Sequence, residues 1–120
     1  MKYSNLEKFI SLSDLFFINE FGYSEIYRIF KQLNEKYNEY LNYDFNDNCE
    51  SLKLDDEINN LLRNKDLLDL DDNLLYISMN KQRKKDIRDS LSNEMINNYS
   101  KMIIDYKKLN NKEVQKRKSL

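Results

Sequence analysis

The chain has 120 residues, of which 40 % are hydrophobic and 34 % charged, with one glycine, no proline and no histidine. That length suits one domain with a modest core, and the apolar fraction excludes a fully disordered chain. Without glycine and proline the chain can form long helices, whereas β-rich domains need many turns. The absence of histidine removes the commonest general base and metal ligand, so we expect neither an enzyme nor a metal or cofactor site.

The net charge of -1 conceals two parts of opposite charge. Residues 1–80 carry 8 Lys and Arg against 16 Asp and Glu, a net of -8, and residues 81–120 carry 12 against 5, a net of +7. Three explanations are open: a solvated basic helix, a segment that contacts phosphates, or head-to-tail pairing between chains. Cys49 is the single cysteine, and we find neither a secretory signal nor an apolar run of ~20 residues, so we expect a cytoplasmic protein without a membrane segment.

Apolar spacing predicts one helix or two short ones over residues 4–21, with Ser13 placed to cap a new start. Gly22 follows this segment, and a glycine can accept a positive φ and end a helix. Ser24 is then the expected N-cap of a second helix that runs to about Leu41, because its apolar residues recur at gaps of three and four.

An Asn- and Asp-rich loop is expected over residues 42–51, because these side chains compete for local backbone hydrogen bonds. A third helix should run from Ser51 or Leu54 to about Arg63, with its carboxylates in the first turn. Two short apolar runs surround an Asp-Asp-Asn turn within residues 67–79, which predicts a β-hairpin. Continued helix is the alternative here, because leucine is a weak strand former.

Residues 81–115 are expected to form one long helix with an apolar seam close to a heptad repeat. The seam comprises Ile87, Leu91, Met95, Tyr99, Met102, Tyr106 and Leu109. It could pack on its own domain or against a second copy. A 30-residue helix is ~45 Å long, more than a core of about 80 residues covers, so we expect a homodimer. The chain then divides into a domain over residues 1–80 and a basic dimerisation helix over residues 81–120.

The expected order of elements places the chain in the mainly α (α+β) class, with three helices, a small hairpin and a long C-terminal helix. Residues 14–33 look like two helices around a glycine turn, residues 55–65 like a third helix, and residues 67–79 like a wing. This order resembles winged helix-turn-helix domains, including PadR-like regulators. The resemblance implies a dimer whose third helix enters the major groove of double-stranded DNA, as a transcription regulator or an accessory DNA-binding protein of a plasmid or phage.

On this interpretation Asn reads adenine, Arg reads guanine, and the basic start of the long helix contacts phosphates. The residues expected to contact DNA are Lys53, Asn59, Asn60, Arg63, Lys65, Lys81, Arg83, Lys84, Lys85 and Arg88. A solvated helix face is the alternative for Asn59 and Asn60, and a solvated helix start for the run from Lys81.

The acidic start of the third helix and the acidic hairpin turn disagree with a DNA contact, because carboxylates are repelled by phosphates. They favour a second hypothesis, an acidic helical protein-interaction module such as a phage-type inhibitor or an antitoxin-like partner that does not bind DNA. Most aromatic residues belong to the core by their spacing, whereas Tyr43 and Tyr76 are expected to be exposed.

Overall fold

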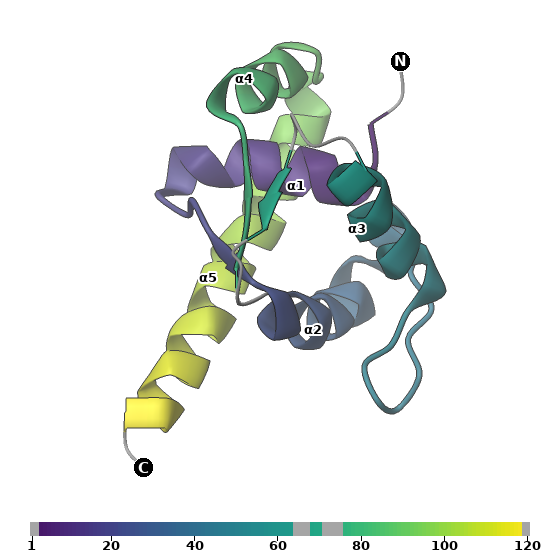
Figure 1. Ribbon diagram of the computed structural model, residues 1–120. Coiled ribbons are helices and arrows are strands. Elements are labelled where there is room, and N and C mark those ends of the chain that lie inside the picture. Colours follow the sequence, from purple (N-terminus) through teal and green to yellow (C-terminus); the bar gives the residue numbers. More distant parts are fainter. Residues whose placement is uncertain (1–2, 64–67, 71–75, 119–120) are drawn as a thin grey trace.

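The computed structural model describes residues 3–63, 68–70 and 76–118, with side chains for residues 3–63 and 76–112. Within these ranges the chain is mainly helical, with a small antiparallel sheet (Figure 1). The helices are α1 (Asn5–Ser13), a 3-10 turn η1 (Asp14–Phe16), α2 (Tyr23–Leu41), α3 (Leu52–Arg63), α4 (Lys81–Asp89) and α5 (Asn93–Lys118). The strands are β1 (Phe21–Gly22), β2 (Leu68–Leu70) and β3 (Tyr76–Met79). The predicted mainly α class is confirmed.

The three strands form a sheet of order β1-β3-β2. On β3, Ile77 pairs with Phe21 of β1, and Met79 pairs with Leu68 of β2. The two strands of the predicted hairpin are therefore confirmed, and the helical alternative is wrong; the hairpin turn lies outside the described residues, at 71–75. Strand β1 was not predicted, because two residues are too few to display an alternating pattern.

In the segment before α2, the residue in the left-handed conformation is not the glycine. Phe17 has φ 63° and ends η1, whereas Gly22 has φ -64° and is the N-cap of α2. Gly22 therefore does not take the positive φ that a glycine can accept, and the predicted N-cap at Ser24 is wrong. A Cβ at Gly22 would lie 2.0 Å from a carboxylate oxygen of Glu25, so a larger residue here requires that side chain to move.

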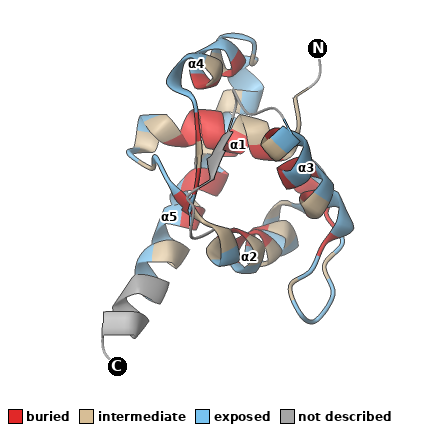
Figure 2. Ribbon diagram, viewed as in Figure 1, coloured by how far each residue is buried: buried red, intermediate tan, exposed pale blue. Residues whose placement is uncertain are grey.

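The buried parts of the helices face one another (Figure 2). Four aromatic rings contact one another within this core. The ring of Phe9 lies 4.8 Å from that of Phe30 and 5.3 Å from that of Tyr106, which in turn lies 5.6 Å from Phe21. These rings come from α1, α2, α5 and β1. Residues on both sides of the predicted boundary at residue 80 therefore share one core.

The predicted long C-terminal helix is two helices, because the chain turns between residues 90 and 92. The Ser90 hydroxyl donates to the carbonyl oxygen of Ile87 at 2.6 Å, which caps the end of α4. The Ser92 hydroxyl accepts from the backbone N–H of Met95 at 3.2 Å, which caps the start of α5. Hydroxyls that bond to the backbone in this way interrupt a helix. The break lets α4 lie against α1 while α5 packs on both α1 and α2.

This folding back makes most of the expected dimer seam unavailable to a second copy. The seam residues buried within one chain are Ile87, Tyr99, Met102 and Tyr106, and those partly buried against the same core are Leu91 and Leu109. Met95 is the exposed member of the seven, at 41 %. The predicted interface is therefore wrong, because its central residues already fill the core. A homodimer remains a prediction, and it requires another surface.

Candidate interaction surfaces

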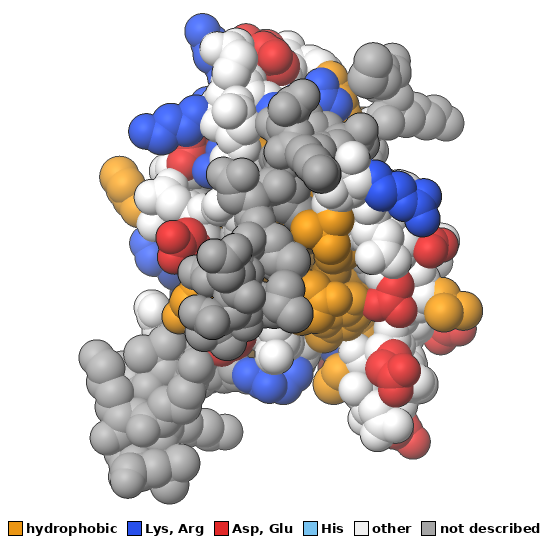
Figure 3. Space-filling model, in the orientation of Figure 1, with side chains coloured by type: hydrophobic (Ala, Val, Ile, Leu, Met, Phe, Trp, Pro, Cys, Tyr) orange, Lys and Arg blue, Asp and Glu red, His pale blue; other side chains and the backbone are white. Residues whose placement is uncertain are grey.

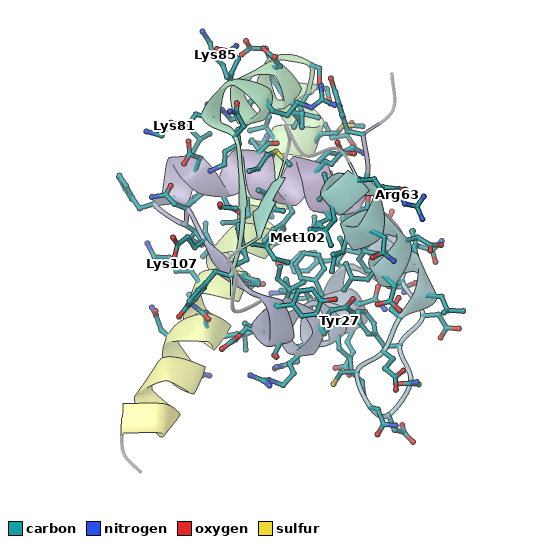
Figure 4. The ribbon with its side chains drawn as sticks, in the orientation of Figure 1. Tyr27, Arg63, Lys81, Lys85, Met102 and Lys107 are labelled. Carbon is teal, nitrogen blue, oxygen red and sulfur yellow. The ribbon has the colours of Figure 1, made fainter. Side chains whose placement is uncertain are left out.

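The outward face of α3 carries three of the predicted DNA-contacting residues. Leu54, Ile58 and Leu61 of this helix are buried, as its apolar spacing requires. On the opposite face Asn59, Asn60 and Arg63 are exposed, and Arg63 points away from the body of the molecule (Figure 4). The exposure of these three side chains is as predicted, while their contact with DNA remains a prediction.

Lys53, also on α3, makes contacts within the fold. Its Nζ donates to the carbonyl oxygens of Leu41 at 2.9 Å and Asn42 at 3.1 Å, and lies 5.1 Å from the centre of the Tyr43 ring. These bonds satisfy carbonyls at the end of α2, which are otherwise without intrahelical donors. Lys53 is exposed as well, so its predicted contact with DNA remains a prediction. Lys65 lies outside the described residues.

The predicted phosphate-contacting run on α4 divides between two faces of the helix. Lys81 and Lys85 are exposed, whereas Lys84 is buried, with 3 % of its surface exposed. Lys84 Nζ lies 3.5 Å from Oδ1 of Asp14, and Arg88 lies 3.6 Å from Oδ2 of the same carboxylate. These two cations therefore hold α4 against the end of α1, and the prediction that they contact phosphates is wrong.

Arg83 also points toward α1. Its guanidinium lies 3.7 Å from Oε2 of Glu7 and 4.9 Å from the centre of the Tyr3 ring. Arg88 in addition donates to the carbonyl oxygen of Ser11 at 2.9 Å. Three of the five cations on α4 thus contact α1 or the residues next to its ends, which leaves two for a partner.

The remaining predicted contacts do not form one surface. Lys81 and Lys85 lie at one side of the molecule and Arg63 at the other, with the sheet between them (Figure 4). Lys81 and Lys85 therefore lie away from the outward face of α3 that carries Arg63.

An acidic cleft opens between the first half of α2, the loop that follows α2, and the start of α3. It has a volume of about 560 Å³. The described residues that line it include three carboxylates and one cation, namely Asp47, Glu50, Asp55 and Arg28. The rings of Tyr23 and Tyr27 on its wall are 5.7 Å apart. We call this feature the acidic cleft.

The hydroxyl of Tyr27 joins the two helices at the acidic cleft by donating a hydrogen bond to Oδ1 of Asp55. Burial, followed by this hydrogen bond, raises the pKa of Tyr27, so the hydroxyl remains a protonated donor at neutral pH. The cleft was not predicted as a site. Its carboxylates come from the Asn- and Asp-rich loop and the acidic start of α3, so their clustering was visible in the sequence, whereas the tyrosine wall required the packing of α2 on α3.

A buried polar junction lies on the opposite face of α3. Oε1 of Glu57 accepts from the backbone N–H of Leu6 at 3.1 Å and from the hydroxyl of Tyr43 at 2.6 Å. Burial raises the pKa of Glu57, although both hydrogen bonds act to lower it. Tyr43 has 4 % of its surface exposed, so its predicted exposure is wrong, while that of Tyr76 is confirmed at 47 %.

The exposed charges are separated across the molecule. Lys and Arg side chains predominate along the edge formed by α4 and α5, and Asp and Glu side chains along the edge formed by α3 and the loop after α2 (Figure 3). Lys107 of α5 lies on the same side as Lys81 and Lys85 (Figure 4). The acidic and basic parts of the sequence therefore remain acidic and basic sides in the folded chain.

Comparison of the chain with protein-family models, curated proteins and solved structures finds no match. Within the described ranges, no helix combines the length and the apolar character that crossing a bilayer requires. In the same part of the chain, no group of three or more Cys, Asp or Glu side chains is arranged to hold a metal ion.

Proposed function

We propose that the chain is a winged-helix interaction module whose acidic cleft binds a basic segment of a protein partner. The observation that carries this proposal is the position of the charged side chains. Most predicted phosphate contacts on α4 are engaged within the fold, whereas three carboxylates line a cleft beside α3. A surface of this sign attracts cationic side chains and repels phosphates.

The order of elements supports the winged-helix part of the proposal. Three helices precede the hairpin, and the sheet order β1-β3-β2 joins the hairpin to the segment between α1 and α2. The winged-helix order inferred from the sequence likewise has three helices ahead of a hairpin. A fold does not determine a function, so the chemistry of the surface decides the proposed partner.

The acidic cleft offers two kinds of contact to a cationic side chain. The carboxylates of Asp47 and Glu50 are exposed and supply ion pairs. The faces of Tyr23 and Tyr27, inclined at 56°, supply cation–π contacts. A guanidinium is planar, stacks on aromatic rings and pairs with carboxylates through two N–H groups, whereas an ammonium is a strongly hydrated point charge. We therefore expect arginine-containing segments to bind more tightly than lysine-containing ones.

Binding of double-stranded DNA by α3 is the second candidate. It is favoured by one specific observation, the exposure of Asn59, Asn60 and Arg63 on one helix face. Asn can pair with adenine and Arg with guanine. With few phosphate contacts available, such binding would be weak and its dependence on salt shallow.

The two candidates are separated by fluorescence anisotropy of the full chain against a labelled oligo-arginine peptide and a labelled DNA duplex. The proposal predicts that the peptide binds and that Asp47→Lys/Glu50→Lys abolishes this binding. Glu20→Lys/Glu39→Lys changes the net charge equally at exposed positions outside the cleft, so it controls for general attraction and should retain most of the affinity.

Duplex binding that is lost in Asn59→Ala/Arg63→Ala and kept in the cleft variant would favour the second candidate. Equal loss of peptide binding in the cleft and control variants would contradict the proposal, because it would mean that net charge and not the cleft attracts the peptide. An oligo-lysine peptide of the same length tests the preference for arginine.

A further inference from the structure

The end of α5 extends beyond the core and is strongly basic. Described packing of this helix on the core reaches Leu109, and the helix continues to Lys118. Nine further residues at 1.5 Å each extend the helix about 13 Å past Leu109, and the end of α5 projects past the other elements (Figure 1). Residues 112–118 contain four cations and one carboxylate, a net of +3. We call residues 112–118 the basic arm.

The basic arm and the acidic cleft of one chain face different ways. The loop that lines the cleft lies on the side of α3, and the end of α5 lies on the opposite side of the molecule (Figure 1). Because the arm continues a helix, it cannot turn back toward its own cleft without breaking backbone hydrogen bonds. A cleft that receives this arm must therefore belong to another molecule.

We propose that the basic arm of one copy docks in the acidic cleft of a second copy. This inference rests on the proposed function, because it names the basic segment that the cleft receives. Three carboxylates and one guanidinium give the cleft a net charge of -2, against +3 for the arm. Arg117 supplies the guanidinium that suits the tyrosine wall, and Lys116 and Lys118 supply neighbouring charges.

The contact is heterologous, because it joins different surfaces of the two copies. Two copies that exchange arms form a closed pair, and copies that each pass an arm to the next form an open chain. Exposed ion pairs are individually weak. Association is therefore concentration-dependent, and it weakens as the Debye length falls from about 10 Å at 0.1 M salt to about 3 Å at 1 M.

Sedimentation velocity of the full chain over a concentration series tests the inference. We expect assembly at low salt, with about a tenfold or larger rise in Kd for Lys116→Glu/Arg117→Glu and for Asp47→Lys/Glu50→Lys. The matched controls are Lys81→Glu/Lys85→Glu and Glu20→Lys/Glu39→Lys, which make the same changes in net charge elsewhere and should assemble like the natural chain.

Mixing the two variants gives the decisive test. The arm variant carries an acidic arm and the cleft variant a basic cleft, so an equal mixture should form a mixed species although neither variant assembles alone. A natural chain that stays monomeric at low salt overturns the inference, as does a mixture that stays monomeric or a control that loses assembly equally. If the oligo-arginine peptide still binds the cleft of a monomeric chain, the proposed function survives and only the identity of the partner is wrong.

Discussion

Replacement of Glu57 tests how the buried junction behind α3 is stabilised. Its Oε1 atom receives both the backbone N–H of Leu6 and the hydroxyl of Tyr43, so one atom serves two buried donors. Glu57→Ala removes the acceptor for both. Glu57→Gln keeps an oxygen in the same place and removes the charge. The two substitutions therefore separate the hydrogen bonds from the cost of burying a carboxylate.

The expected loss for Glu57→Ala follows from the two donors. A buried donor left without a partner costs about 1–3 kcal/mol, which gives about 2–6 kcal/mol for the pair. Removal of a desolvated carboxylate offsets part of this cost, and water can enter the vacated space. We therefore expect the free energy of unfolding to fall by about 2–3 kcal/mol. For Glu57→Gln we expect a value within about 1 kcal/mol of the natural protein at neutral pH.

The contribution of Glu57 to stability changes with pH in a direction that its pKa determines. Burial raises the pKa of Glu57 above its ordinary value of 4.5, so the folded chain holds this proton more tightly than the unfolded chain does. The contribution of Glu57 to stability is therefore fully present below pH 4.5 and is lost as the pH rises through the folded pKa. Glu57→Gln lacks this titration. The stability of the natural protein relative to the Gln variant should thus decline from acid to neutral pH.

Urea unfolding followed by circular dichroism at a series of pH values measures this difference, with the free energy obtained by linear extrapolation. Subtracting the Gln variant cancels the titration of other groups, provided that they are unaffected by the substitution. A difference that is flat or rises with pH would refute the reasoning about burial. An Ala variant as stable as the Gln variant would show that the two hydrogen bonds contribute nothing.

Three further substitutions test other local arguments by urea unfolding. Asp14→Ala leaves buried Lys84 without its carboxylate and should cost about 1–3 kcal/mol, since Asp14 itself is partly exposed. Phe17→Asn places a residue that tolerates φ 63° where an 87 % exposed ring now stands, and should stabilise the fold by about 0.5–1 kcal/mol. Gly22→Ala should change stability by less than about 1 kcal/mol, because φ -64° suits alanine and the Glu25 carboxylate can rotate away.

Two of these substitutions have a control variant. Lys85→Ala removes an exposed cation of α4 and should change stability by less than about 0.5 kcal/mol; a loss equal to that of Asp14→Ala would contradict the internal role of the α4 cations. Phe17→Ala removes the ring without easing the left-handed backbone, so a gain equal to that of Phe17→Asn would contradict the argument from φ. A loss of several kcal/mol in Gly22→Ala would mean that its neighbours cannot move.

Apolar periodicity was sufficient to predict the elements that bury one clear face. The gaps of three and four over α2 and α3 predicted both helices to within a few residues, since Ile26, Ile29, Leu33, Leu54 and Ile58 are all buried. The hairpin strands followed from alternation, because Ile77 and Met79 face the core while Tyr76 faces outward. These patterns can be seen among residues close together in the sequence, and the side that they mark is the side buried in the core.

Features that depend on contacts far apart in the sequence could not be predicted in this way. The buried position of Tyr43 depends on Glu57 of α3 and Leu6 of α1, which come together only after the helices pack. The apolar seam on α5 was predicted correctly, but it packs on its own chain and not on a second copy. The two serines at positions 90 and 92 could have indicated the break, since Ser favours helix caps over helix interiors.

The cations of α4 show most clearly how a charge run can mislead. Ile87 is the one apolar residue between positions 81 and 89, so it defines the side of this helix that faces the core. Residues three and four before it share that side on a helix, and these are Lys84 and Arg83. Lys85, two residues before Ile87, lies on the opposite side. Lys81 and Arg88 are seven residues apart and lie close to one line along the helix, so only the position of Asp14 beside Arg88 distinguishes them. Composition alone counts five equal cations, whereas packing separates three that contact Glu7 or Asp14 from two that meet solvent. A basic run should therefore be divided by its apolar neighbours before any of it is assigned to a phosphate, because an internal carboxylate such as Asp14 competes for the same side chains.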